Sequence, residues 1–257
     1  MKLEGIIFDV DGTIADTEDI HRQAFNKAFS KFNLNWYWPK EKYHELLFIS
    51  GGKERITKCL TEDGAVNEDK NFVEELHKCK SEYYRSILID SDIGLRPGIK
   101  RLITEAKENN IKIGIATNSS TENLKTLIKK TFRIEPKELF NTIITNNIVI
   151  DKKPSPEVYY RALTDLKLSA DNCIAIEDTA NGNASAIKAG LRTIITTHAY
   201  TLDNDFSGAS LVLNNLGEPK NGFCTDENFH CKKSYVDIEL INTIIINEND
   251  FLLKQKY

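Results

Sequence analysis

The stretch Leu3-Glu4-Gly5-Ile6-Ile7-Phe8-Asp9-Val10-Asp11-Gly12-Thr13 decides the fold of this chain. Its first half is a short apolar run, which is typical of a strand buried on both faces of a parallel sheet. Its second half places two carboxylates, Asp9 and Asp11, at the carboxyl end of that strand, and Gly12 then lets the chain turn sharply. Ligands of open α/β sheets bind at this end of the strands. The stretch therefore predicts an α/β sheet with a site beside its first strand.

Further short apolar runs resemble the first, and helical patterns alternate with the later ones. The predicted strands cover residues 3–8, 111–117, 142–145, 173–177 and 193–196. The predicted helices cover residues 98–109, 121–130, 156–166 and 180–189, with a last one over 236–246. This alternation predicts an α/β fold with a Rossmann-like parallel sheet core.

Residues 16–93 interrupt the alternation. They are dominated by helix-like periodicity, seen in the spacing of Ile20, Ala24, Ala28 and Phe32. Pro97-Gly98 then marks the return to the main domain. We expect a core domain of residues 1–15 and 94–257, with residues 16–93 inserted as a helical cap domain.

Composition excludes several classes of partner. The 257 residues carry 34 basic and 38 acidic side chains, a net charge of −4, and 40% hydrophobic residues, as an ordinary globular protein does. Binding to nucleic acid or an anionic membrane needs clustered Lys and Arg, and no basic stripe is visible. No stretch approaches the roughly eighteen apolar residues of a membrane span. We therefore expect neither a nucleic-acid nor a membrane partner.

The cysteines favour a reducing compartment. Their number, 5, is odd and their spacing is wide, which does not suit a disulfide framework. Cys224, His230 and Cys231 lie close in sequence, but no CxxC pair accompanies them, so we interpret the two cysteines as ordinary free thiols rather than zinc ligands. The N-terminal apolar run is too short for a signal peptide. We expect a cytoplasmic protein.

The two carboxylates after the first strand suit phosphoryl transfer. Asp9 can act as a nucleophile through an aspartyl-phosphate. Asp11 is placed to protonate a leaving alkoxide and then to deprotonate the attacking water. Glu177 and Asp178 end a later strand, where a pair of acids alone would be read as a solvated helix start. In the proposed sheet, however, this strand end faces the end of the first strand, which carries Asp9. The acids together therefore predict a Mg²⁺ site, with Asp178 as a direct ligand and Glu177 as support.

Two further strand ends carry groups that suit a phosphate. Thr117 and Asn118 follow the second strand just before a helix, where small donors can bind phosphate oxygens, although a helix cap explains them equally well alone. Lys153 precedes another helix and can neutralise the phosphate during transfer.

These motifs, Asp9-Val10-Asp11-Gly12-Thr13, Thr117-Asn118, Lys153-Pro154 and Glu177-Asp178, resemble the four ordered motifs of the haloacid-dehalogenase-like hydrolases. The resemblance implies a nucleophilic Asp9, an acid–base Asp11, and Thr117 and Lys153 as phosphate binders. It implies Mg²⁺ held at Asp9, Asp11 and Asp178, with Glu177 in support. It also implies that the helical insertion is a cap that closes over the substrate.

The insertion itself is similar to the Calvin-cycle-associated phosphatases of xylulose-1,5-bisphosphate. The similarity lies in Ala15 to Glu18, His21 to Asn26, Trp36, Tyr43, Leu46-Leu47 and Gly51 to Ile56. It implies an enzyme that releases phosphate from that sugar bisphosphate and leaves xylulose 5-phosphate. Separately, we expect a monomer. A sugar bisphosphate has a second, distal phosphate that is not cleaved. This phosphate would be bound by Lys53 and Arg55 together with the N–H groups of a loop that includes Gly52. The alternative is that Lys53 and Arg55 only form the solvated start of a helix. Glu18, His21, Tyr43 and Asn118 complete the expected substrate site.

Two other functions stay open. A sugar-phosphate mutase of the β-phosphoglucomutase kind shares both aspartates and a similar cap. A non-catalytic phosphosugar-binding protein would bind without turnover, against which the complete set of motifs argues. Asn183 departs from the apolar residue usual in relatives, and the segment after Asn221 carries none of the motifs on which the resemblance rests.

Overall fold

The computed structural model describes residues 2–63, 70–224 and 233–246, and in them six strands form one parallel sheet. They are β1 (Gly5–Phe8), β2 (Lys112–Ala116), β3 (Thr142–Ile144), β4 (Cys173–Glu177), β5 (Arg192–Thr196) and β6 (Leu211–Leu213). Their order is β3-β2-β1-β4-β5-β6, which confirms the predicted Rossmann-like sheet. Phe8, the last residue of β1, lies opposite Ile115 and Ile176, so the residues after β1, β2 and β4 meet at one edge. The short β6 was not predicted.

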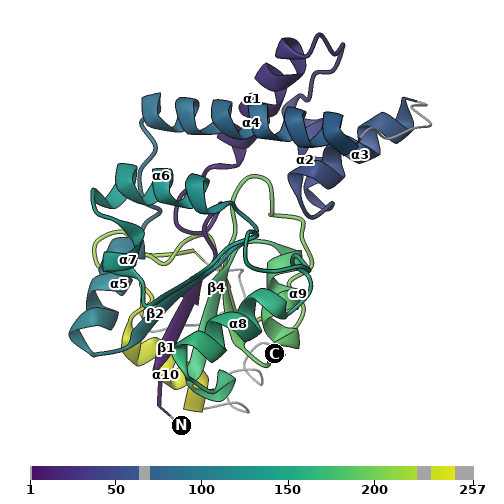
Figure 1. Cartoon of the computed structure of the whole chain (residues 1–257). Coiled ribbons are helices and arrows are strands. Elements are labelled where there is room, and N and C mark those ends of the chain that lie inside the picture. Colours follow the sequence, from purple (N-terminus) through teal and green to yellow (C-terminus); the bar gives the residue numbers. More distant parts are fainter. Residues whose placement is uncertain (1, 64–69, 225–232, 247–257) are drawn as a thin grey trace.

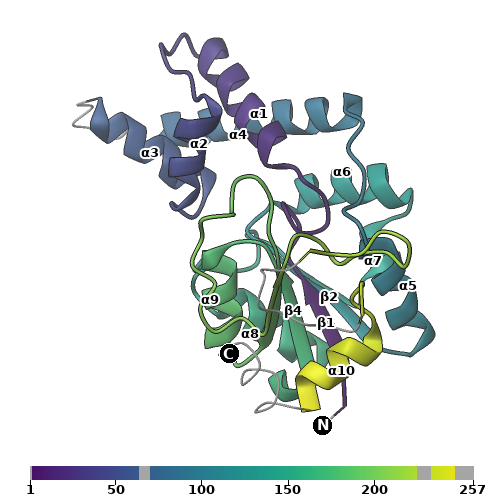
Figure 2. The same cartoon turned by 180° about the vertical axis from the view of Figure 1, so that it is seen from behind.

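Helices cover both faces of the sheet, as alternation along β1 requires. Ile6 and Phe8 pack in one hydrophobic cluster with α5 (Ile99–Glu108), α6 (Thr121–Phe132) and α10 (Ile238–Ile246). Ile7 packs in another cluster, with α8 (Glu157–Leu166) and α9 (Ala180–Lys188). Figures 1 and 2 show α8 and α10 on opposite faces. The short α7 (Pro136–Leu139) precedes β3, and the 3-10 turn Ala170–Asn172 precedes β4.

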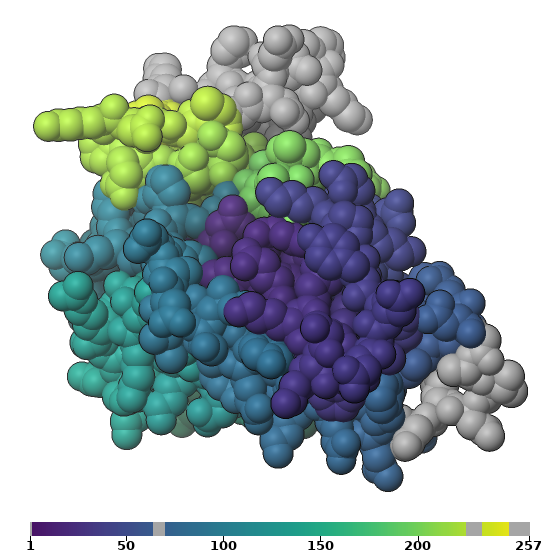
Figure 3. Space-filling model, turned by 90° about the horizontal axis from the view of Figure 1, so that it is seen from above, coloured from purple at the N-terminus to yellow at the C-terminus, as the bar shows by residue number. Residues whose placement is uncertain are grey.

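Between β1 and β2 the described chain is helical. The helices that precede α5 are α1 (Glu18–Lys31), α2 (Lys40–Leu47), α3 (Gly52–Glu62) and α4 (Lys70–Asp90), called here the cap helices. They have an aromatic-rich core of their own that includes Phe25, Phe29, Trp38 and Tyr43. The cap helices lie beyond the carboxyl ends of the strands (Figure 1) and cover most of that end of the molecule in purple and blue (Figure 3). The helical insertion is present, and its division from the core at residues 16 and 93 stays a prediction.

Arg96 anchors the point where the chain returns from the cap helices. Its N–H donates to the carbonyl of Ile14 at 2.9 Å, so the outgoing and returning segments are directly joined. Its guanidinium group donates to the carbonyls of Gly12, Thr196 and Thr197, among others. One side chain therefore fixes the turn after β1 against the end of β5.

Three sequence-based expectations concern the rest of the chain. Asn183 is buried, but its side chain accepts from Thr193 Oγ1 at 2.7 Å and donates to the Ser207 carbonyl at 3.2 Å, so the helix tolerates it. Cys224 is a free thiol, whereas His230 and Cys231 lie outside the described residues. The last helix is present and begins at Ile238. Among the described residues, none of the helices has the length and apolar character needed to cross a membrane.

Candidate active site

A cavity of about 490 Å³ lies between the strand ends and the cap helices, a size that suits a small-molecule ligand. The structure brings most of the predicted site residues to its lining, namely Asp9, Asp11, Glu18, His21, Gly52, Lys53, Arg55, Thr117, Asn118, Lys153 and Asp178. Two predicted residues, Tyr43 and Glu177, are fully buried behind the lining. The motifs after β1, β2 and β4 therefore meet cap residues across one cavity.

Asp9 and Lys153 form a buried ion pair in this cavity. Lys153 Nζ donates to Asp9 Oδ1 and to Glu177 Oε1, both at 2.6 Å. Burial raises the pKa of Asp9 well above its usual range, against the effect of Lys153 and with that of the neighbouring carboxylates. Burial lowers the pKa of Lys153, but Asp9 and Glu177 raise it by more, so the ammonium stays charged. Among the described residues Lys153 donates to Oδ1, so Oδ2 is the less engaged oxygen of Asp9.

Asp9, Glu177 and Asp178 form a buried acidic cluster with ligand oxygens within 4.8 Å of one another. Three buried carboxylates beside the single ammonium of Lys153 leave an excess of negative charge, which a hard divalent cation would balance. Carboxylate oxygens are also the donors that such cations prefer. The donor set therefore fits a metal ion. The structure does not bring the carboxylate of Asp11, the fourth predicted ligand, into this cluster of described residues.

The carboxylate of Asp11 is held by donors from the cap side. Its Oδ1 accepts from Thr17 Oγ1 at 2.6 Å and from the Tyr84 hydroxyl at 3.1 Å, and lies 3.1 Å from His21 Nε2. Burial raises the pKa of Asp11, but His21, Thr17 and Ser119 lower it by more, so the pKa falls below its usual range. Asp11 is therefore a carboxylate in this arrangement.

His21 links Asp11 to a buried lysine of α4. Lys80 Nζ lies 2.7 Å from His21 Nδ1, and its side chain is only 5% exposed. It also lies 4.6 Å from the ring centre of Phe25. Burial, followed by the charge of Arg55, lowers the pKa of Lys80 to about 7. This lysine can change its charge near neutral pH.

Thr117 and Asn118 differ in what they leave free for a ligand. Thr117 Oγ1 accepts from the Ser119 N–H at 3.1 Å, which leaves the Thr117 hydroxyl proton for an incoming acceptor. Asn118 instead accepts from the Lys153 N–H at 3.1 Å and donates to Ser50 Oγ at 3.0 Å. Ser50 in turn donates to the Lys153 carbonyl. Asn118 therefore ties the Lys153 loop to Ser50 on the cap side.

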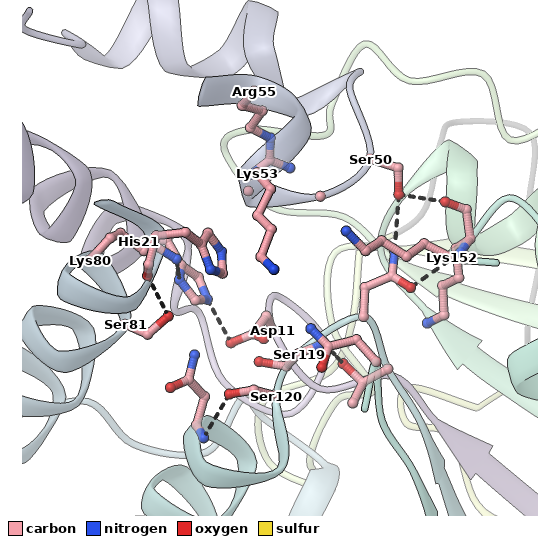
Figure 4. Close-up of a pocket in the computed structure, with 18 of the residues that line it drawn as sticks. Asp11, His21, Ser50, Lys53, Arg55, Lys80, Ser81, Ser119, Ser120 and Lys152 are labelled. Carbon is pink, nitrogen blue, oxygen red and sulfur yellow. Dashed lines mark hydrogen bonds and ion pairs between the residues drawn. The ribbon is translucent and has the colours of Figure 1, made fainter. Parts of the chain in front are cut away.

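The predicted cap cations reach the cavity, but both have protein partners. In Figure 4, Lys53 extends into the cavity toward Asp11, with Arg55 behind it. Lys53 pairs with Glu74 on α4 and is partly exposed. Arg55 Nε donates to the carbonyls of Leu46 and Ile49, both at 3.0 Å. Arg55 thus also holds the end of α2, a role that the sequence did not predict.

Gly52 and Tyr43 have packing roles. A Cβ atom on Gly52 would lie 2.6 Å from His77 Nε2, so glycine permits the close approach of α3 to α4. The Tyr43 hydroxyl donates to Glu18 Oε2 at 2.8 Å, and the Tyr43 side chain is 0% exposed. Glu18 lines the cavity and Tyr43 supports it from behind.

Sequence reasoning missed several residues of the site, among them Lys80, Tyr84, Tyr159 and His198. Tyr159 donates to Glu177, and His198 Nε2 lies 2.9 Å from Asp178 Oδ2. Lys80 had a detectable signal, because it occupies the same apolar stripe of α4 as Leu76 and Tyr84. A charged residue on a buried helix face usually has a specific partner.

Comparisons with known proteins agree with this geometry. Residues 6–196 match the family described as haloacid dehalogenase-like hydrolase. Protein CbbY of Rhodobacter capsulatus is 44% identical over 209 residues, which cover 81% of this chain and 92% of the relative. A crystal structure of mutant CbbY from Rhodobacter sphaeroides in complex with xylulose-(1,5)bisphosphate is 37% identical with a TM-score of 0.79, covering 84% of this chain and 96% of that one. A β-phosphoglucomutase structure from Clostridium difficile is 26% identical with a TM-score of 0.66, covering 82% and 90%. The chain belongs to the haloacid dehalogenase-like hydrolases.

Proposed function

We propose that this protein is a Mg²⁺-dependent sugar-phosphate phosphatase that hydrolyses xylulose-1,5-bisphosphate to xylulose 5-phosphate and phosphate. The observation that carries the proposal is the cavity itself, which has Asp9 and Lys153 on the sheet side and Lys53 and Arg55 on the cap side. The similarity to CbbY, whose mutant was crystallised with xylulose-(1,5)bisphosphate, supports the choice of substrate.

In the first step, Asp9 Oδ2 attacks the phosphorus, and the bond between phosphorus and the sugar oxygen breaks. Asp11 gives its proton to the leaving alkoxide. Because Asp11 is a carboxylate while Thr17, His21 and Tyr84 hold it, it first has to take up a proton from solvent water and exchange these partners for the sugar oxygen. The products of this step are an aspartyl-phosphate and the free sugar hydroxyl.

In the second step, water attacks the aspartyl-phosphate while Asp11 takes a proton from it. The bond between phosphorus and Asp9 Oδ2 breaks, which releases phosphate, restores the Asp9 carboxylate and leaves Asp11 protonated for the next cycle. Lys153 and the Thr117 hydroxyl bind the phosphoryl oxygens through both steps. A Mg²⁺ ion at Asp9 and Asp178 would neutralise charge on the transferring group. Lys53 and Arg55 bind the distal phosphate, and Glu18 and His21 bind sugar hydroxyls.

Phosphate release from xylulose-1,5-bisphosphate tests the proposal. Asp9→Asn should lower turnover at least about a hundred-fold, because a nucleophile is lost. Asp11→Asn should lower it by roughly 10²–10⁴, the range of general acid–base groups. Asp16→Asn removes an exposed carboxylate of the same segment and serves as the matched control. Near-wild-type turnover of the Asp9→Asn variant would contradict the proposed role of Asp9 as the nucleophile.

A sugar-phosphate mutase is the second candidate, favoured by the β-phosphoglucomutase relative. Incubation with β-glucose 1-phosphate separates the two functions, because a mutase would yield glucose 6-phosphate. We expect free phosphate or no product.

The proposal also includes that the protein is a monomer and is located in the cytoplasm. Light scattering at micromolar concentration tests the oligomeric state.

A further inference from the structure

His198 lies beside the acidic cluster. It follows β5 and is 7% exposed. Its Nε2 atom lies 2.9 Å from Oδ2 of Asp178, which is 1% exposed. A buried hydrogen bond between a histidine and a carboxylate of a metal site can act by orienting that carboxylate.

The surroundings of His198 determine which ring nitrogen carries the proton. The backbone N–H of Tyr200 points at His198 Nδ1 at 3.3 Å, so Nδ1 is an acceptor. Nε2 then carries the proton and donates to Asp178. Two further bonds hold the turn: the His198 N–H donates to Thr201 Oγ1 at 3.1 Å, and the Thr201 N–H donates to the His198 carbonyl at 2.8 Å. The direction of the histidine donor is therefore set by its own loop.

The second oxygen of Asp178 is also held. Thr13 Oγ1 donates to Asp178 Oδ1 at 3.0 Å, from the turn after β1. A Cβ atom on Gly12, whose φ is +86°, would lie 2.2 Å from Asp178 Oδ2 and 2.7 Å from His198 Nε2. Glycine at this position is what lets the histidine and the carboxylate meet. Donors from two different loops thus fix the rotation of one carboxylate.

We propose that His198 is a positioning residue that holds Asp178 in the orientation needed to bind a divalent cation. This inference rests on the metal site of the proposed function. Each oxygen of Asp178 keeps lone-pair capacity beyond its one bond to a protein donor, and this capacity can serve the cation. His198 contributes by removing the freedom of the carboxylate to turn away.

The test compares His198→Gln with His198→Asn, two variants that differ by one methylene group. The Gln amide can reach the place of Nε2, whereas the Asn amide ends near the place of Nδ1. Binding of Mn²⁺ to the substrate-free protein, followed by the electron paramagnetic resonance of free Mn²⁺, is the readout. We expect His198→Asn to weaken Mn²⁺ binding by roughly 10- to 100-fold, the usual cost of losing such a partner. His198→Gln should stay within about three-fold of the wild type, since it restores the donor.

His44→Asn is the matched control. His44 lies on α2, and its Nε2 atom is 2.9 Å from the carboxylate of Asp203, a residue shortly after His198, at a more exposed position. It should leave Mn²⁺ affinity unchanged. Wild-type affinity in His198→Asn would overturn the inference, and so would equal losses in the Asn and Gln variants, which would indicate a packing role. If the wild type binds no Mn²⁺ at all, the metal site of the proposed function fails as well, so the two failures are distinguishable.

Discussion

Lys153 Nζ donates to Asp9 Oδ1 at 2.6 Å, which joins two residues that are 144 positions apart in the sequence. Both side chains are almost inaccessible, with exposed fractions of 4% for Lys153 and 11% for Asp9. Removing one partner of such a pair leaves an uncompensated buried charge, and this is far costlier than removing an exposed pair. The pair therefore supports both the chemistry and the stability of the site.

Lys153→Met should lower the free energy of unfolding at pH 8 by about 3–5 kcal/mol and abolish most phosphate release. The neighbouring Lys152 pairs with Glu54 at a more exposed position. Lys152→Met should change the free energy of unfolding by less than about 1 kcal/mol. Denaturant unfolding of both variants measures the difference. Equal effects would show that Asp9 and Glu177 do not depend on the buried ammonium.

Mg²⁺ should raise the melting temperature of the EDTA-treated protein, because it relieves repulsion among Asp9, Glu177 and Asp178. At a concentration of one hundred times its Kd, a ligand specific for the folded state adds about 2.7 kcal/mol. Asp178→Asn should remove most of this gain. Differential scanning calorimetry at constant ionic strength, with NaCl replacing MgCl₂, provides the control. An equal Mg²⁺ gain in the wild type and the variant would argue against binding at this cluster.

Lys80 should make stability depend on pH. Its folded-state pKa of about 7 lies below the unfolded value, so between pH 7 and about 10 the unfolded chain binds the extra proton. The free energy of unfolding should therefore rise with pH in that window, and the penalty should be complete below pH 7. Lys80→Met should flatten this rise and add of the order of 3 kcal/mol at pH 6. Urea unfolding across pH 6–10 measures it, with exposed Lys78→Met as the control that keeps the wild-type slope.

Arg55→Ala should separate two substrates. We expect kcat/KM for xylulose-1,5-bisphosphate to fall by about 1.5–3 kcal/mol of transition-state stabilisation, the scale of a charge-assisted hydrogen bond. Hydrolysis of p-nitrophenyl phosphate, which has no second phosphate, should hardly change. Because Arg55 also donates to the carbonyls of Leu46 and Ile49, the melting temperature must be measured alongside. Equal losses on both substrates would assign Arg55 to structure alone.

The sheet could be predicted because its central strands are apolar on both faces. The run that ends at Phe8 reads as a buried strand without further context, and its carboxyl end locates Asp9. By contrast, β6 contains only Leu211, Val212 and Leu213, too short a run to show a period. These residues form a strand because they pair with β5, and the local sequence pattern does not indicate that pairing.

The site was predictable where residues follow strands and less so where helix packing brings them together. Asp178 could be placed because β4 pairs directly with β1. Tyr84 reaches Asp11, and Lys80 reaches His21, only through the packing of α4 against α1, and no local pattern specifies those contacts. His198 follows β5 and could have been found by the reasoning that found Asp9. The protein partners of Lys53 and Arg55 could not be predicted, because they depend on side-chain geometry that the spacing of residues in the sequence does not determine.

The hydrogen bond from the Arg96 N–H to the Ile14 carbonyl, 2.9 Å long, has a consequence for how such proteins diversify. The outgoing and returning segments of the cap helices meet at one place, so the helices between them can be lengthened, rebuilt or exchanged as a module. For the sheet itself, only the spacing of the two chain ends has to be preserved. The register that aligns Phe8 with Ile115 and Ile176 does not pass through the inserted helices. New substrate preferences can therefore arise by grafting at this joint while the sheet-side groups Asp9, Lys153 and Asp178 are inherited unchanged.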